Sequence, residues 1–410
     1  VNVRQFTPEG TLSALEGELP RLAEMGAGIL WLMPIHPIGV ENRKGSLGSY
    51  YSVADYYGVN PEFGTLSDLK SLVKKAHELG LYVIIDWVAN HSAWDNPLIE
   101  KHPDWYTKDS AGRIIPPVAD WTDVADLDFS QAGLRDYMEE AMAYWVKECD
   151  IDGFRCDVAG MVPATFWNST VPRLRAIKPL FMLAEEETAA MHDTAFDATY
   201  SWGLHHVMND IARGKKTADR IDSVLAAERS AYPRDAYRMR FTSNHDENTW
   251  SGTEYERLGS GARTFAVFTF TFPGIPMVYS GQEAAMNRRL RFFDKDTIPW
   301  GGYVLADFYS KLMHLKKNND LVASGDSGGS FIKVPAGRDR QTYSFLRVKG
   351  DRKLFVLLNF SDADQVMLPE GTAFRGHYRE LFTGQEKEWK PGDRVTLSPW
   401  QYLVYLSVPN

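Results

Sequence analysis

Short apolar segments alternate with amphipathic helical segments along the first three-quarters of this 410-residue chain. This alternation is typical of parallel sheets built from successive strand–helix units. Near the start, leucines spaced three and four apart in residues 11–25 predict a helix that ends at Gly26. Further on, Thr65-Leu-Ser-Asp68 resembles a capping box and predicts the start of another helix.

Eight of the apolar segments are predicted to be the strands of one barrel. They are residues 1–6, 29–34, 81–86, 153–157, 181–185, 195–200, 238–242 and 277–280. Eight such units within about 320 residues predict an α/β fold of the (β/α)8 TIM barrel type. A doubly wound open sheet is the alternative, but the chain has no glycine-rich dinucleotide turn to favour it.

Two regions are predicted to lie outside the barrel. Residues 91–130, rich in Trp, Pro and Asp, are too long for an ordinary loop after the third strand and predict a small inserted subdomain. From residue 321 onwards, short alternating segments separated by turns predict a C-terminal antiparallel β-sandwich domain. The expected domains are residues 1–90 with 131–320 for the barrel, 91–130 for the insert and 321–410 for the sandwich.

Charge and cysteine content exclude several classes of protein. The chain has 45 Lys and Arg against 54 Asp and Glu without a block of like charge, so nucleic acid and anionic membranes are not expected partners. Its cysteines, Cys149 and Cys156, are too few for a disulfide scaffold or a cysteine zinc site. Pro and Gly interrupt the most apolar stretch, residues 265–279, so membrane insertion is not expected.

Carboxyl groups follow the predicted strands, at the end of the barrel where reactive groups lie. They are Asp86, Asp157, Glu185 and Asp246. Arg155 precedes Asp157 by two residues, so both side chains point toward the barrel axis, and the guanidinium is expected to lower the pKa of Asp157. Partial burial is expected to raise the pKa of Glu185 toward that of a general acid. One charged and one protonated carboxyl group form the working pair of a glycosidase.

Four segments resemble the signature regions of the α-amylase family, glycoside hydrolase family 13. In chain order they are Asp86–His91, Gly153–Asp157, Leu183–Glu185 and Asn244–Asp246. Residues 48–64 and 274–283 are also similar, so the resemblance covers essentially the whole chain. It implies a retaining hydrolase that cleaves the α-1,4 bonds of starch or maltooligosaccharides by double displacement.

The resemblance also implies a role for each matching residue. The catalytic groups are the nucleophile Asp157, the acid/base Glu185 and the transition-state stabiliser Asp246. The substrate-binding groups are Tyr51 under the sugar, His91 and His245 as donors to its hydroxyls, and Arg155 as the partner of Asp157. Asp86 is expected to brace the barrel end. The partner is an α-glucan, and the oligomeric state stays open.

No cofactor is expected for the chemistry, whereas a structural Ca²⁺ ion is left open. Asn90 matches a calcium ligand of many family members, and hard oxygen ligands are also available from Asp120, Asp123, Asp126 and Asp128. The chain departs from the family where Val158 to Met161 replace a Lys-His pair that contacts the leaving side of the substrate. Thr188 also stands where neopullulanase-like relatives have Trp.

Several alternatives stay open. The same carboxyl groups would serve an α-glucan transglycosylase, or a hydrolase of α-1,6 or other α-glucosidic bonds. A metal-dependent amidohydrolase would need histidine ligands on the first strand, and residues 1–6 contain none. A catalytically inactive binding protein would have lost a carboxyl group that is present here. Four loop tryptophans are either sugar platforms or loop anchors: Trp94, Trp121, Trp202 and Trp250.

The compartment is inferred from the class of substrate. The first residues are strand-like and show no charged and apolar leader, so we expect that a signal peptide is absent or already removed. Family members that degrade polymers are usually exported, which predicts an extracellular or periplasmic protein if this is a mature chain. Otherwise a cytoplasmic protein is expected.

Overall fold

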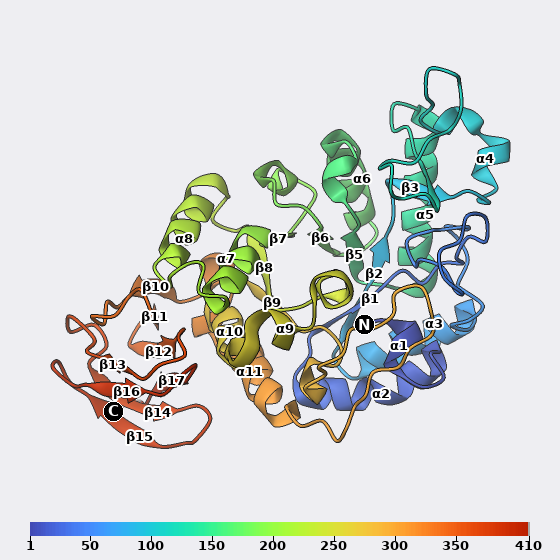
Figure 1. Cartoon of the computed structure of the whole chain (residues 1–410). Helices are drawn as coiled ribbons and strands as arrows, with labels where there is room; N and C mark the ends of the chain where they lie inside the picture. The colour runs from blue at the N-terminus through green and yellow to red at the C-terminus, as the bar shows by residue number, and fades with distance from the viewer. Residues whose placement is uncertain (409–410) are drawn as a thin grey trace. The chain divides into compact units, whose positions relative to one another are not determined.

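A computed structural model describes residues 1–408 of the chain, which divides into two compact units (Figure 1). The first unit comprises Val1–Tyr200 together with Leu290–Pro299. The second comprises Ser201–Arg289 and the chain from Trp300 onwards. The segment 290–299 therefore packs with residues that are far from it in the sequence.

The first unit contains a parallel sheet with the strand order β1-β2-β5-β6-β7. Its strands are β1 (Ile29–Leu32), β2 (Tyr82–Trp87), β5 (Gly153–Cys156), β6 (Phe181–Ala184) and β7 (Ala198–Tyr200). In the register of this sheet, Asp86 lies opposite Arg155, and Arg155 lies opposite Leu183. Because the strands are parallel, the residues that follow β2, β5 and β6 emerge at the same edge.

The first unit contains four helices longer than one turn, and some of their ends match signals in the sequence. They are α2 (Leu12–Met25), α3 (Leu66–Glu78), α5 (Ala132–Cys149) and α6 (Ala164–Arg175). Thr65 and Asp68 form the predicted capping box at the start of α3, each side chain bonding the other's backbone N–H. Gly26 ends α2 with φ 100°, in the left-handed region that favours glycine.

The predicted strand over residues 1–6 is wrong, because Val3–Phe6 form one helical turn, α1. Gln5 is completely buried, and its side-chain amide donates to the carbonyls of Arg291 and Asp294 at 2.7 and 3.1 Å. Its side-chain carbonyl accepts from the backbone of Asp296, and its backbone carbonyl from that of Ile298. These bonds to a distant segment stabilise a turn that the local apolar pattern could not indicate. The other seven predicted strands are present.

The inserted segment between β2 and α5 contains little regular structure. Strands β3 (His91–Ala93) and β4 (Val124–Asp126) pair antiparallel, and a short helix, α4 (Leu98–Lys101), lies between them in the sequence. Trp105 packs against Tyr137 of α5 at 5.7 Å between ring centroids. The insert therefore lies beside α5, as Figure 1 shows.

The second unit contains the parallel pair β8 (Tyr237–Phe241) and β9 (Ile275–Met277). The predicted last strand, residues 277–280, overlaps β9 at Met277 alone. The helices of this unit are α7 (Trp202–Ala212), α8 (Arg220–Ala231), α9 (Glu254–Leu258), α10 (Ala262–Thr271) and α11 (Ala306–Asn318). No helix within residues 1–408 is long and apolar enough to span a membrane.

The C-terminal part of the second unit is antiparallel, as predicted. Six strands form one sheet in the order β10-β11-β12-β17-β14-β15, and β13 pairs with β16. The strands are β10 (Ser330–Lys333), β11 (Thr342–Lys349), β12 (Arg352–Asn359), β13 (Gln365–Met367), β14 (Gly376–Glu380), β15 (Glu386–Trp389), β16 (Val395–Leu397) and β17 (Tyr402–Ser407). Met367 and Leu397 from the small sheet share a core with Phe355 and Trp389 from the large one.

Candidate active site

The guanidinium of Arg155 is the centre of a buried cluster of carboxyl groups. Its Nη1 atom lies 2.9 Å from Oδ1 of both Asp86 and Asp157. Its Nη2 atom lies 2.9 Å from Oε2 of Glu185. Since the terminal nitrogens of one planar group bind Asp157 and Glu185, these two carboxyl groups are neighbours. The adjacency of β2, β5 and β6 therefore brings the groups at three strand ends to one place.

Asp86 connects this cluster to the aromatic residues beside it. Its Oδ2 atom accepts hydrogen bonds from the Tyr51 hydroxyl at 3.0 Å and from the Trp31 indole at 3.1 Å. Burial raises the pKa of Asp86 to about 6, although Arg155 opposes the shift. Asp86 is completely buried and fully engaged, which is the arrangement expected of a bracing group.

The electrostatics of Asp157 differ from the expectation based on Arg155 alone. Burial raises the pKa of Asp157 well above its ordinary value, and the charge of Glu185 adds to this effect. Arg155 acts in the expected direction, but its single charge is shared by three carboxyl groups. The cluster therefore takes up a proton more readily than exposed carboxylates do. A nucleophile and an acid that share one proton are a recurring arrangement in catalytic carboxyl pairs.

The residue after Asp157 has a strained backbone. Val158 lies in the left-handed region, with φ 36° and ψ 48°, which is costly for a β-branched residue. In this conformation its backbone N–H donates to Oε2 of Glu185 at 2.8 Å. Glu186 instead accepts from Glu187 and Thr188 in a local turn. These contacts distinguish Glu185 from the two glutamates that follow it.

Replacing Val158 with glycine tests this strain. We expect Val158→Gly to leave the free energy of unfolding unchanged or raise it by about 1 kcal/mol, because about 1–3 kcal/mol of strain is relieved. The control is Val348→Gly in β11, where a half-buried valine has an extended backbone. The free energy of unfolding of this control variant is expected to fall by at least about 1 kcal/mol. Urea denaturation measures both values, and equal losses would argue against strain at Val158.

His91 and Tyr51 lie next to the cluster. The Nε2 atom of His91 is 3.9 Å from Oδ2 of Asp157, and burial lowers the pKa of His91 to about 3. His91 is therefore neutral at pH 7. The ring of Tyr51 lies parallel to that of Phe292, with an interplanar angle of 14° and 6.2 Å between centroids. Phe292 belongs to the segment 290–299, which is not a strand end, so the sequence argument missed it.

His245 and Asp246 belong to the second unit, where they follow β8. Nε2 of His245 lies 3.3 Å from Oδ2 of Asp246, and 36% of the Asp246 side chain is exposed. The neighbouring Glu247 is half-buried, and its burial is outweighed by His205 and Arg257, which lower its pKa to about 2. Asp246 thus differs from Glu247 in keeping a solvent-accessible carboxyl group.

The loop tryptophans have different surroundings. The indole of Trp94 donates to the carbonyl of Thr122 at 2.9 Å, which anchors the insert. The ring of Trp121 meets His91 edge to face, with 5.5 Å between centroids. In the second unit, Trp202 packs against Phe241, whereas 55% of Trp250 is exposed. Trp121 therefore contacts a predicted site residue of the first unit.

The expected calcium ligands are engaged in other contacts. The backbone carbonyl of Asn90 accepts from Leu127, and its side-chain amide lies 3.3 Å from Nδ1 of His91. The carboxylate of Asp123 is paired with Lys44, and that of Asp128 accepts from Ser130. Among residues 1–408, no three His, Cys, Asp or Glu side chains are grouped to hold a metal ion. The residues around Asn90 therefore do not fit the calcium site that the resemblance left open.

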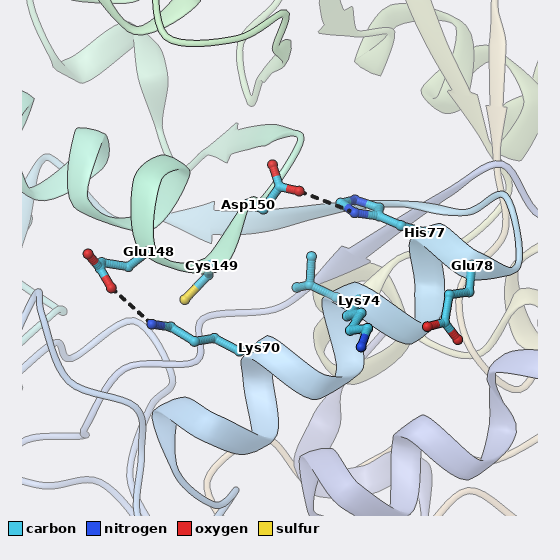
Figure 2. A pocket seen from close by; sticks show the side chains of 8 residues that line it. Lys70, Lys74, His77, Glu78, Glu148, Cys149 and Asp150 are labelled. Carbon is cyan, nitrogen blue, oxygen red and sulfur yellow. Dashed lines mark hydrogen bonds and ion pairs between the residues drawn. The ribbon is translucent and has the colours of Figure 1, made fainter.

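A separate cavity of about 330 Å³ lies between α3 and α5 (Figure 2). It is lined mainly by charged side chains, including the pairs Lys70–Glu148 and His77–Asp150. Burial raises the pKa of the Cys149 thiol at this cavity to about 12, so the thiol is not a nucleophile at neutral pH. Both helices end here just before β2 and β5 begin, at the opposite end of the sheet from Arg155.

Comparisons with known proteins identify the family and support the fold. The sequence model of the α-amylase catalytic domain matches residues 4–114 and 118–298. A noncanonic maltogenic α-amylase, AmyB from Thermotoga neapolitana, has a similar structure with a TM-score of 0.92 and 33% identity, covering 100% of this chain and 98% of that one. An α-amylase from Lactobacillus plantarum has a TM-score of 0.89 and 29% identity, with coverages of 100% and 97%.

Among curated sequences, α-amylase 2 of Dictyoglomus thermophilum is 25% identical over 402 residues, which are 92% of this chain and 67% of that protein. The chain spans 56–67% of the length of the first three curated relatives. The two similar structures, in contrast, are matched over nearly their whole length.

Proposed function

We propose a function for this chain from the premise that it belongs to the α-amylase family of glycoside hydrolases. The proposed reaction is hydrolysis of α-1,4 bonds in starch or maltooligosaccharides, with retention of configuration. The observation that carries it is the binding of Asp157 and Glu185 by the two terminal nitrogens of Arg155. Retaining glycosidases need two carboxyl groups about 5–5.5 Å apart. Hydrolysis in this family needs no cofactor.

In the first step, Asp157 attacks the anomeric carbon while Glu185 protonates the glycosidic oxygen. The C–O bond to the leaving sugar breaks, and a covalent glycosyl ester forms on Asp157. The neutral imidazole of His91 offers an N–H to a hydroxyl of this sugar, since burial disfavours its charged form. The ring of Tyr51 offers a flat apolar surface for the sugar, and its hydroxyl is held by Asp86.

In the second step, Glu185 removes a proton from water, and the resulting nucleophile attacks the anomeric carbon. The ester bond to Asp157 breaks, and the α-configuration is restored after two inversions. We assign Asp246 to stabilising the positive charge that develops on the sugar in both steps. Its partly exposed carboxylate beside His245 supports this role.

The configuration of the first product tests the retaining mechanism. We expect ¹H NMR of a maltoheptaose digest to show the α-anomer first and the β-anomer only as mutarotation proceeds. Initial formation of the β-anomer would contradict the mechanism. Pullulan in a parallel digest tests linkage, and we expect products that keep their α-1,6 bonds, since cleavage of these bonds alone would release maltotriose.

Transglycosylation is the second candidate. The chain departs from the family after the nucleophile, where Val158 to Met161 stand in place of the Lys-His pair that contacts the leaving side, so the subsite that a sugar acceptor would occupy has different contacts here. The same glycosyl ester would then be attacked by a sugar hydroxyl instead of water. Products longer than maltoheptaose in the digest would support this reaction.

A further inference from the structure

Lys44 joins two segments that are far apart in the sequence. It lies in the long connection between β1 and α3, and its ammonium donates to the backbone carbonyl of Asp120 at 2.9 Å. The same ammonium lies 2.9 Å from Oδ1 of Asp123. The Asp123 side chain is only 7% exposed, whereas that of Lys44 is 32% exposed. One cation therefore binds a carbonyl and a nearly buried carboxylate of the insert.

Other contacts connect the same two segments. The hydroxyl of Ser52 donates to the backbone carbonyl of Asp123, and the backbone N–H of Val40 donates to the side chain of Asp95. Arg43, the neighbour of Lys44, instead donates to carbonyls of its own loop, those of Ile38 and Gly39. Among these contacts, Lys44 supplies the positive charge that faces Asp123.

Carboxylates and backbone carbonyls are also the ligands that Ca²⁺ prefers. Here the Lys44 ammonium binds one carboxylate and one backbone carbonyl. Both belong to the acidic segment for which the family resemblance left a calcium ion as an open possibility. We propose that the Lys44 ammonium takes the place of a metal ion at the insert. It links residues 120–123 of the insert to the β1–α3 connection, in which Lys44 lies. This proposal concerns stability and does not depend on the proposed function.

The link has a consequence for the candidate site. Trp121 lies between Asp120 and Asp123 in the sequence, and its ring contacts His91. Lys44 therefore binds a backbone carbonyl before Trp121 and a side chain after it, and Trp121 packs against the site. In this proposal Lys44 is a positioning residue, since it contacts Asp120 and Asp123 and acts on His91 only through Trp121.

Thermal unfolding of the whole chain tests the proposal. The variants are Lys44→Met and, as the control, Lys108→Met, which removes an exposed lysine of the same insert. We expect the wild type and the control to unfold at the same midpoint temperature. This temperature should also be the same in EDTA and in millimolar CaCl2. Lys44→Met should lower the midpoint by at least about 3 °C in both buffers. Limited proteolysis should cut this variant faster between residues 94 and 123.

A second variant, changed also at the partner of Lys44, extends the thermal unfolding experiment. Loss of the ammonium leaves the Asp123 carboxylate nearly buried and unpaired, and this is the costly state. The double variant Lys44→Met/Asp123→Asn is therefore expected to unfold at a higher temperature than Lys44→Met. The proposal is overturned if EDTA lowers the wild-type midpoint, if elemental analysis finds one calcium per chain, or if Lys44→Met behaves like the control. It is also overturned if the double variant is no more stable than Lys44→Met.

Discussion

Asp157→Ala is expected to lower kcat on maltoheptaose by at least about 10⁴-fold, because no other group can form the glycosyl ester. The expected effect on stability is different. Three carboxyl groups surround one guanidinium, so removal of Asp157 relieves its repulsion with the other two. The thermal midpoint of the variant is therefore expected to equal or exceed that of the wild type. Initial rates and thermal unfolding measure the two effects.

The control for this prediction is Asp109→Ala, which removes a carboxylate of the insert that is bound to Arg113. It should keep wild-type kcat. Sodium azide provides a further check, since a small anion can enter the space left by the carboxylate and attack the anomeric carbon directly. The expected product is a glycosyl azide of inverted configuration. Residual activity of Asp157→Ala above a hundredth of the wild-type value would exclude Asp157 as the nucleophile.

Arg155→Met is expected to lower the free energy of unfolding by about 3–5 kcal/mol at pH 7, since the buried carboxyl groups lose their cation. The loss should depend on pH. Burial raises the pKa of Asp86 to about 6 and that of Asp157 well above its ordinary value. Both groups favour the folded state when protonated, so their contribution is full below about pH 4 and is lost as the pH rises through these folded-state values.

Without Arg155, deprotonation of Asp86 and Asp157 in the folded state is opposed more strongly. The difference in the free energy of unfolding between variant and wild type is therefore expected to grow from pH 4 to pH 7. Urea denaturation at several pH values measures it, and the low-pH points remain accessible if the variant unfolds at pH 7. Arg173→Met is the control, because Arg173 pairs with Glu139 at the surface with 66% of its side chain exposed. Its effect should be small at every pH. If the difference in the free energy of unfolding between Arg155→Met and the wild type does not change with pH, charge is not the cause of the loss of stability.

The sequence was informative where the site follows from strand order. Asp86 and Arg155 lie in β2 and β5, and Glu185 directly follows β6, the next strand in the sheet, so the polar residues at these ends had to meet. Family membership confirms the predicted fold class, a TIM barrel with an insert and a C-terminal antiparallel β domain. Helix starts marked by a capping residue such as Thr65 could also be predicted, because a helix cap depends only on residues that are close in the sequence.

The failures arose where distant contacts decide. Gln5 forms its hydrogen bonds with residues 291–298, so the turn over Val3–Phe6 could not be predicted from an apolar pattern. The neighbour of Tyr51 in the same segment, Phe292, was missed for the same reason. Spacing predicted a pair between Arg155 and Asp157 but could not show that two more carboxyl groups share the guanidinium.

The binding of residues 290–299 by Gln5 also limits the order in which the chain can fold during synthesis. When residue 200 leaves the ribosome, all five sheet strands β1, β2, β5, β6 and β7 of the first unit have been made. The amide of Gln5 has no partners yet, because its acceptors at Arg291 and Asp294 have not been translated. An intermediate of this length lacks the hydrogen bonds that stabilise the turn over Val3–Phe6. The first unit is therefore completed only after the part of the second unit from Ser201 to Arg289 has been made.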